Sequence, residues 1–85
     1  MRRVWVDSSS IASIGYDAAT RKLEIEFRES GDVYRYFDVP EEECAAFLAA
    51  DSKGTYLNQV FKERNYRYRL VRRGTQTSTP RQGLG

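Results

Sequence analysis

The segment 22–28 alternates strictly between charged and apolar side chains, and it constrains the fold more than any other part of the chain. Leu23, Ile25 and Phe27 fall on one face of this segment when it is extended, and charged residues fall on the other. Such alternation is typical of an antiparallel strand that is covered on one side only. The chain must therefore supply neighbouring strands and an apolar layer for that one face.

Two further strands are predicted beside it. Residues 8–17 place Ala12, Ile14 and Tyr16 on one face, and residues 33–39 place Tyr34 and Tyr36 together on one face. Asp17 can bond its own backbone in the turn 17–21, and Gly31 is free to take a positive φ in the turn 29–32. The three strands form a meander.

Two short helices should follow the meander. Pro40 suits the first position of a helix, and the glutamates 41–43 complement the positive end of its dipole. Residues 51–54 end this helix, and Asp51 or Ser52 can cap a second one that ends near residue 65. Its apolar stripe is Tyr56, Leu57, Val60 and Phe61. The core expected from both helices and the sheet comprises Ile14, Leu23, Ile25, Phe27, Phe47, Leu57, Val60 and Phe61.

Residues 66–71 alternate again and predict either a short edge strand or an extended arm. The fold class is therefore α+β: a three-stranded antiparallel β-meander followed by two short helices packed on one face, with a C-terminal edge strand as an option. We expect one domain over residues 1–72. Residues 73–85 lack periodicity and are predicted to be a disordered polar and basic tail.

The composition argues against several classes of function. Cys44 is the only cysteine and the chain has no histidine, so neither an internal disulfide nor a typical zinc site is expected. Histidine-dependent catalysis is excluded, and no apolar pocket is evident around the carboxylates to support a paired-carboxylate mechanism. We expect no enzyme activity, no metal and no cofactor. No apolar run is long enough to span a membrane and no signal peptide is evident, so a cytoplasmic protein is expected.

The charge is distributed unevenly along the chain. Residues 1–61 have seven basic and eleven acidic residues, whereas residues 62–85 have seven basic residues and a single acidic one, Glu63. A basic C-terminal segment attracts polyanions such as RNA, DNA or acidic lipid. The alternative is a solvated, arginine-rich end that improves solubility.

Two tyrosine and arginine patterns are candidates for binding nucleic acid. Tyr34, Arg35 and Tyr36 lie on one strand, and unpaired bases stack on such rings while arginine contacts phosphate. Alternatively, these tyrosines pack beneath a helix. The second pattern extends to the C-terminal arginines, which would bind a single-stranded nucleic acid or protect an edge strand from aggregation. Its members are Tyr66, Arg67, Tyr68, Arg69, Arg72 and Arg73.

The start of the second helix is a weaker candidate for an anion. Ser52, Lys53, Gly54 and Thr55 bring backbone N–H groups, a hydroxyl and a lysine together where a helix begins. No glycine-rich phosphate loop precedes them, so ordinary capping is the competing interpretation.

Several of these segments, in this order and spacing, resemble the KTSC domain, which occurs at the C-terminus of some lysyl-tRNA synthetases and as a free-standing bacterial protein. The matching residues run from Ser8 to Arg69. They include Ser8-Ser9, Ile14-Gly15-Tyr16-Asp17, Leu23-Glu24-Ile25-Glu26-Phe27, Val33-Tyr34-Arg35-Tyr36, Val39-Pro40, Ser52-Lys53-Gly54-Thr55-Tyr56-Leu57-Asn58 and Tyr66-Arg67-Tyr68.

The resemblance implies an RNA-binding appendage, because of the synthetase context of the family. Two residues depart from the family pattern: Cys44 replaces a bulkier aromatic residue on the first helix, and Arg21 occupies a turn position that often has glycine. The leading hypothesis is a non-catalytic module that binds RNA or another single-stranded nucleic acid. The alternatives are a protein-interaction domain that forms homo-oligomers through its edge strand, and a binder of a small anion such as a nucleotide.

Overall fold

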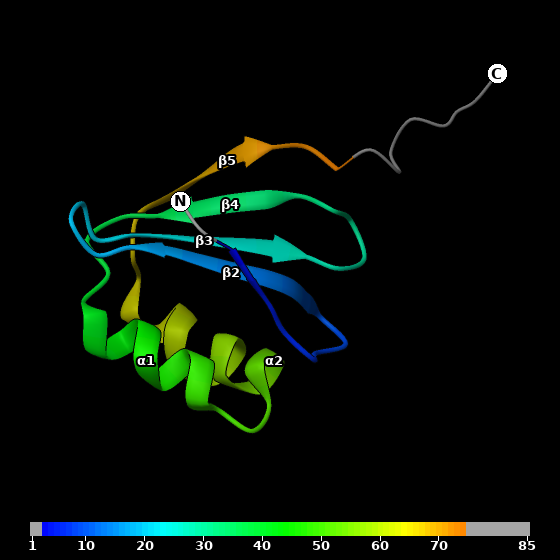
Figure 1. Cartoon of the computed structure of the whole chain (residues 1–85), viewed down its shortest axis with the longest axis horizontal. Coiled ribbons are helices and arrows are strands. Elements are labelled where there is room, and N and C mark those ends of the chain that lie inside the picture. The colour runs from blue at the N-terminus through cyan, green and yellow to red at the C-terminus, as the bar shows by residue number, and fades with distance from the viewer. Residues whose placement is uncertain (1–2, 75–85) are drawn as a thin grey trace, which may run out of the picture.

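The computed structural model describes residues 3–74, and these form a five-stranded sheet with helices on one side (Figure 1). The strands are β1 (Arg3–Trp5), β2 (Ile11–Asp17), β3 (Lys22–Phe27), β4 (Val33–Tyr36) and β5 (Tyr68–Arg72). The helical elements are α1 (Glu41–Ala49), α2 (Lys53–Tyr56), η1 (Leu57–Phe61) and η2 (Lys62–Arg64). The α+β class is confirmed. The predicted tail beyond residue 74 lies outside the described residues.

The sheet is antiparallel throughout, with the strands in sequence order β1-β2-β3-β4-β5. The register places Ile14 beside Ile25, Ile25 beside Tyr34, and Tyr34 beside Leu70. Because paired residues share a face, one apolar face runs across four strands toward the helices. The alternating segment 22–28 lies in the central strand β3, as its pattern predicts.

The two turns of the meander use residues with positive φ. Gly31 has φ 76° in the turn between β3 and β4, as expected. In the turn between β2 and β3, Asp17 Oδ1 accepts a hydrogen bond from the Ala19 N–H, and Arg21 has φ 59°. Arg21 therefore has the left-handed conformation for which glycine is the usual choice.

The first strand, β1, was not predicted from the sequence. It is only three residues long, and Val4 and Trp5 are both exposed, so the segment has no inward and outward alternation to reveal it. Its partner is β2, with Val4 opposite Ile14. The C-terminal alternation does form a strand: β5 pairs with β4 and is the edge of the sheet at the opposite side from β1.

The core lies between the sheet and α1, where Phe47 and Phe61 are fully buried together with Leu23 and Ile25. Cys44 is buried on the same face of α1 and packs in this core. Phe27 and Val60 were expected to be buried in the core, but both are only half-buried. Phe27 is half-buried because it lies beside an open pocket.

The second helix was expected to continue to about residue 65, but it changes pitch twice. Ser52 caps α2 by accepting a hydrogen bond from the Thr55 N–H at 3.3 Å. The following η1 is a wide π-helical turn in which the Lys62 N–H bonds to the Leu57 carbonyl, and η2 is a tight 3-10 turn. Asn65 then ends the segment at φ 61°. Short π turns often occur at functional sites.

Candidate functional site

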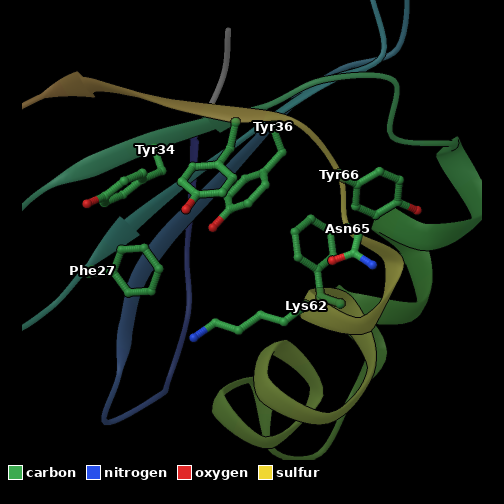
Figure 2. A pocket seen from close by; sticks show the side chains of 8 residues that line it. Phe27, Tyr34, Tyr36, Lys62, Asn65 and Tyr66 are labelled. Atoms are coloured by element: carbon green, nitrogen blue, oxygen red, sulfur yellow. The ribbon is translucent and has the colours of Figure 1, made fainter.

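The changes in helical pitch bring the end of the helical segment opposite strands β3, β4 and β5, and a pocket of about 530 Å³ remains between them. Figure 2 shows rings from the sheet on one side and the helical segment on the other. We call this hollow the aromatic pocket. It is lined by Phe27, Tyr34, Tyr36, Phe61, Lys62, Asn65, Tyr66 and Tyr68. Its volume falls in the range of about 300–1,000 Å³ usual for small-ligand sites.

The sheet wall of the aromatic pocket is a row of tyrosine rings in contact. The Tyr68 ring lies 5.8 Å from that of Tyr34 and 5.3 Å from that of Tyr36. Phe27 extends the row, with an edge-to-face contact to Tyr34 at 5.7 Å. Tyr34 and Tyr36 are two residues apart on β4 and so lie on the same face, and Tyr68 pairs with Tyr36 from β5. The strand register itself therefore creates the row.

The hydroxyl groups of this row have no partner inside the described part of the chain. Within residues 3–74, no hydrogen bond engages the hydroxyls of Tyr34, Tyr36 or Tyr68. Burial, together with the neighbouring Tyr68 and Tyr34, raises the pKa of Tyr36 to about 12. The Tyr36 hydroxyl therefore remains a neutral donor and acceptor for an incoming group.

Lys62 lies on the opposite wall and is the only charged side chain from residues 3–74 that lines the aromatic pocket. Figure 2 shows Lys62 extending from the helical segment toward Phe27, below the tyrosine rings in this view. Lys62 forms no ion pair with any residue between 3 and 74. Asn65 contributes a side-chain amide, which can donate and accept. The pocket therefore combines apolar rings with a few polar groups, as ligand sites do.

A buried carboxylate on α1 holds the third wall in place. The Tyr66 hydroxyl donates to Glu43 Oε1 at 2.8 Å, and Arg64 Nε donates to the same oxygen at 2.7 Å. The Tyr56 hydroxyl donates to Glu43 Oε2. Burial alone would raise the pKa of Glu43, but these three hydrogen bonds and the charge of Arg64 outweigh it and hold the pKa below its ordinary value. Glu43 does lie in the first turn of α1, as expected, but it is also only 6% exposed, which the sequence did not indicate.

A second hollow lies next to the aromatic pocket, along the outer side of β5. We call it the arginine groove; it is lined by Phe37, Asn65, Tyr66, Arg67, Tyr68 and Arg69. Asn65, Tyr66 and Tyr68 line both hollows, so the two lie next to each other. Arg67 lies over the Phe37 ring at 5.5 Å and 3.3 Å from Asp38, but both charged side chains are largely exposed. Such an exposed pair is weak, so Arg67 remains available to an anion.

The predicted binding residues divide between the two faces of the sheet. Tyr34, Tyr36, Tyr66 and Tyr68 line the aromatic pocket. Arg67 and Arg69 line the arginine groove, and Arg69, which pairs with Arg35, lies on the face of the sheet opposite the tyrosine rings. The other three lie elsewhere. Arg35 is on the opposite face of β4, where it donates two hydrogen bonds to Glu24, and Arg72 lies 3.6 Å from Glu26 on that face. Arg73 lines a separate hollow near the turn between β3 and β4.

The paired arginines explain the state of Glu24, which was expected to be exposed. Arg3 donates to Glu24 Oε1 at 2.7 Å and Arg35 to Oε2 at 2.6 Å, so the carboxylate is only 6% exposed although it lies on the uncovered face. Side chains alternate along a strand, so Arg35 points to the opposite face from Tyr34 and Tyr36, where its guanidinium is occupied by Glu24.

The start of α2 is satisfied internally. Ser52 caps the helix, Lys53 Nζ donates to the Ala50 carbonyl at 2.9 Å, and Ser52 Oγ donates to Thr55 Oγ1. Gly54 lies so close to Ser10 that a Cβ would come within 3.1 Å of the Ser10 hydroxyl oxygen. These contacts match the capping interpretation and leave residues 52–55 outside the aromatic pocket.

Four pocket residues were not identified as binding residues from the sequence: Phe27, Phe61, Lys62 and Asn65. Phe27 and Phe61 have the apolar pattern of core residues, and Lys62 is one of several lysines and arginines with no distinguishing neighbour. Asn65 has a recognisable signal, because asparagine often ends a helix in the left-handed conformation.

Two searches over residues 3–74 give negative results. No group of three or more cysteine, aspartate or glutamate side chains in that range could hold a metal ion. None of the helices there is both long enough and apolar enough to cross a bilayer.

Comparison with known proteins gives consistent matches. Residues 7–68 match the family model described as the KTSC domain. An uncharacterised protein of Stutzerimonas stutzeri is 53% identical over 68 residues, which cover 80% of this chain and 94% of that protein. A protein of Tsukamurella paurometabola is 41% identical over 59 residues, 69% of this chain and 87% of the relative.

A solved structure agrees with the fold. The crystal structure of a KTSC domain protein from Yersinia pestis matches with a TM-score of 0.77 and 44% sequence identity. The match covers 84% of this chain and 97% of the other.

Proposed function

The chain belongs to the KTSC domain family, and from this membership together with the geometry of its two hollows we propose that it is a non-catalytic module that binds single-stranded nucleic acid, RNA in preference to DNA. A base would enter the aromatic pocket, and the phosphates that follow it would lie along the arginine groove. RNA is favoured because proteins that stack unpaired bases on aromatic rings commonly bind its loops and ends.

The proximity of the two hollows supports the proposal most directly. A nucleotide needs an aromatic surface for its base and a cation for its phosphate, a short distance apart. Tyr68 and Asn65 line both hollows, and Arg67 and Arg69 lie beside them. Stacking on an aromatic ring contributes about 1–3 kcal/mol for each base, and arginine binds phosphate with little regard to sequence.

The edge strand favours an anionic partner over a second copy of the chain. Arg69 and Arg72 lie on β5, and Arg67 comes just before it. If two copies paired antiparallel along β5, these arginines would come close together, and like charges opposite each other destabilise a sheet. Sedimentation at several protein concentrations distinguishes the alternatives, since a salt-insensitive dimer without affinity for nucleic acid would favour oligomerisation.

The test is the salt dependence of binding to a labelled single-stranded RNA decamer, measured by fluorescence anisotropy. The slope of log affinity against log salt should be about −0.7 for each phosphate neutralised. The double variant Arg67→Ala, Arg69→Ala should flatten the slope by about 1.4. The matched control, Arg72→Ala with Arg73→Ala, removes two charges outside the groove and should change it little.

Two results would contradict the proposal. The first is no binding at low salt. The second is a slope that both double variants change equally, because the groove would then be no more than part of a diffuse positive charge. A free mononucleotide that binds as tightly as the decamer would instead favour the small-anion alternative.

A further inference from the structure

The polar groups inside the aromatic pocket are unequal in what they can offer a base. The free hydroxyls of Tyr34, Tyr36 and Tyr68 can donate or accept, and so can the amide of Asn65. Lys62 can only donate, because an ammonium has no acceptor. Among residues 3–74, no carboxylate lines the pocket, so none of the side chains there is an obligate acceptor.

Lys62 is placed where a bound base could meet its donor group. Its side chain extends from η2 toward Phe27, on the opposite side of the pocket from the tyrosine rings (Figure 2). Within residues 3–74 it has no ion-pair partner, so its charge is not already neutralised by a neighbouring side chain. Glu63 is next in the chain but does not line the pocket. A base inserted among the rings would therefore meet Lys62 with one of its edges.

We infer that the aromatic pocket selects keto bases, uracil and guanine, over amino bases, cytosine and adenine, and that Lys62 is the residue that makes the selection. This inference rests on the proposed function. At the position where uracil has O4 and guanine has O6, cytosine and adenine have an amino group. An ammonium that contacts this position therefore meets an acceptor in the keto bases and a second donor in the amino bases. The same logic underlies lysine contacts to the O6 and N7 acceptors of guanine.

The experiment compares U10 and C10 RNA, which have equal length and equal phosphate charge. Because both strands use the arginine groove in the same way, the ratio of their affinities isolates the base. The intact protein should bind U10 about tenfold more tightly than C10, the discrimination typical of one good base contact. Lys62→Met keeps the length of the side chain and removes its donor, and it should bring the ratio close to one.

Two further variants separate selection from charge and from folding. Lys62→Arg keeps a cationic donor and should preserve the preference for U10. Arg73→Met removes one exposed positive charge outside both hollows, so it should change the two affinities little and equally and leave their ratio unchanged. An unfolded variant is recognised by circular dichroism, and Lys62 is exposed, so its replacement is expected to be tolerated.

The outcomes distinguish the two proposals. Equal binding of U10 and C10 with a normal salt slope would overturn the selection by Lys62 and leave the proposed function intact. A preference for U10 that persists in Lys62→Met would also overturn it. If neither RNA binds at low salt, the proposed function fails and the inference fails with it.

Discussion

The Tyr66 hydroxyl donates a hydrogen bond to Glu43 Oε1 at 2.8 Å, and this bond joins the wall of the aromatic pocket to α1. In the close-up the Tyr66 hydroxyl points away from the pocket toward α1 (Figure 2). The two residues are 23 positions apart in the chain. The position of Tyr66 in the pocket wall therefore depends on Glu43, a carboxylate that does not itself line the pocket.

Glu43→Gln should destabilise the fold. The amide cannot replace both oxygens of a carboxylate that accepts from Tyr56, Arg64 and Tyr66. We expect a loss of about 2 kcal/mol in the free energy of unfolding, measured by urea denaturation. Glu42→Gln is the matched control, since Glu42 is exposed on the same helix and should change the value little. Equal losses in both variants would rule out the hydrogen-bond network as the cause.

The same carboxylate should make stability depend on acid pH. The pKa of Glu43 in the folded protein lies below its ordinary value, so the folded state binds this proton less readily than the unfolded state. Its contribution is complete above the ordinary glutamate pKa of about 4.3 and is lost as the pH falls through the lower folded pKa. As the pH falls through this range, the free energy of unfolding measured with urea should decrease less for Glu43→Gln than for the intact protein. Parallel curves would contradict the assignment.

Tyr36 should make stability depend on alkaline pH in the opposite sense. Burial raises its pKa in the folded protein to about 12, above the ordinary tyrosine value of about 10. Its contribution is complete below pH 10 and is lost as the pH rises toward 12. Between pH 10 and pH 12, the free energy of unfolding should fall by about 2 kcal/mol less in Tyr36→Phe than in the intact protein. Urea unfolding at a series of fixed pH values measures this difference. A tyrosinate absorbance change assigned to Tyr36 near pH 10 would contradict this.

Arg21→Gly should stabilise the protein slightly or leave it unchanged. Arg21 has φ 59°, a left-handed conformation that costs a residue with a side chain about 1–2 kcal/mol. Glycine removes this strain but increases the entropy of the unfolded chain by about 0.4–1 kcal/mol. The control, Ala19→Gly in the same turn, has no positive φ to relieve and should lose stability by thermal denaturation. A clear loss in Arg21→Gly would contradict the strain argument.

Tyr68→Ala should weaken nucleic-acid binding without unfolding the protein. The ring is 60% exposed and lines both hollows, so its removal takes away stacking area at little cost to the core. We expect a loss of about 1–3 kcal/mol in binding free energy by anisotropy. Trp5→Ala removes an even more exposed ring (72%) from β1, outside the pocket, and should leave the affinity unchanged. Equal losses would mean that exposed rings bind the RNA wherever they lie.

The sheet was largely predictable because its central strands are covered on one face. Leu23 and Ile25 alternate with glutamates, and that period of two identifies both the strand and its buried side. The strand β1 lacks this signal since Val4 and Trp5 are both exposed. The changes of pitch in η1 and η2 were also not predictable, because they depend on tertiary contacts such as those of Glu43 and not on local periodicity.

The site was predictable only in part. The tyrosines of β4 were expected on a single face, and the structure places them there with Tyr68 opposite. The sequence could not show that Arg35 would bind Glu24, since that pairing depends on the register of β3 and β4. Nor could it show that Lys62 and Asn65 would complete the pocket, because they come from a segment that was expected to be an ordinary helix.

The central claim, that one face of the sheet receives an unpaired base, is tested most directly by NMR. A ¹⁵N-labelled sample would be titrated with a short single-stranded RNA, and amide shifts would be followed along the chain. We predict saturable changes at Tyr34, Tyr36, Asn65 and Tyr68, with Arg3 and Glu24 on the opposite face unmoved. Shifts confined to that opposite face, or no shift at any residue at low salt, would contradict the account.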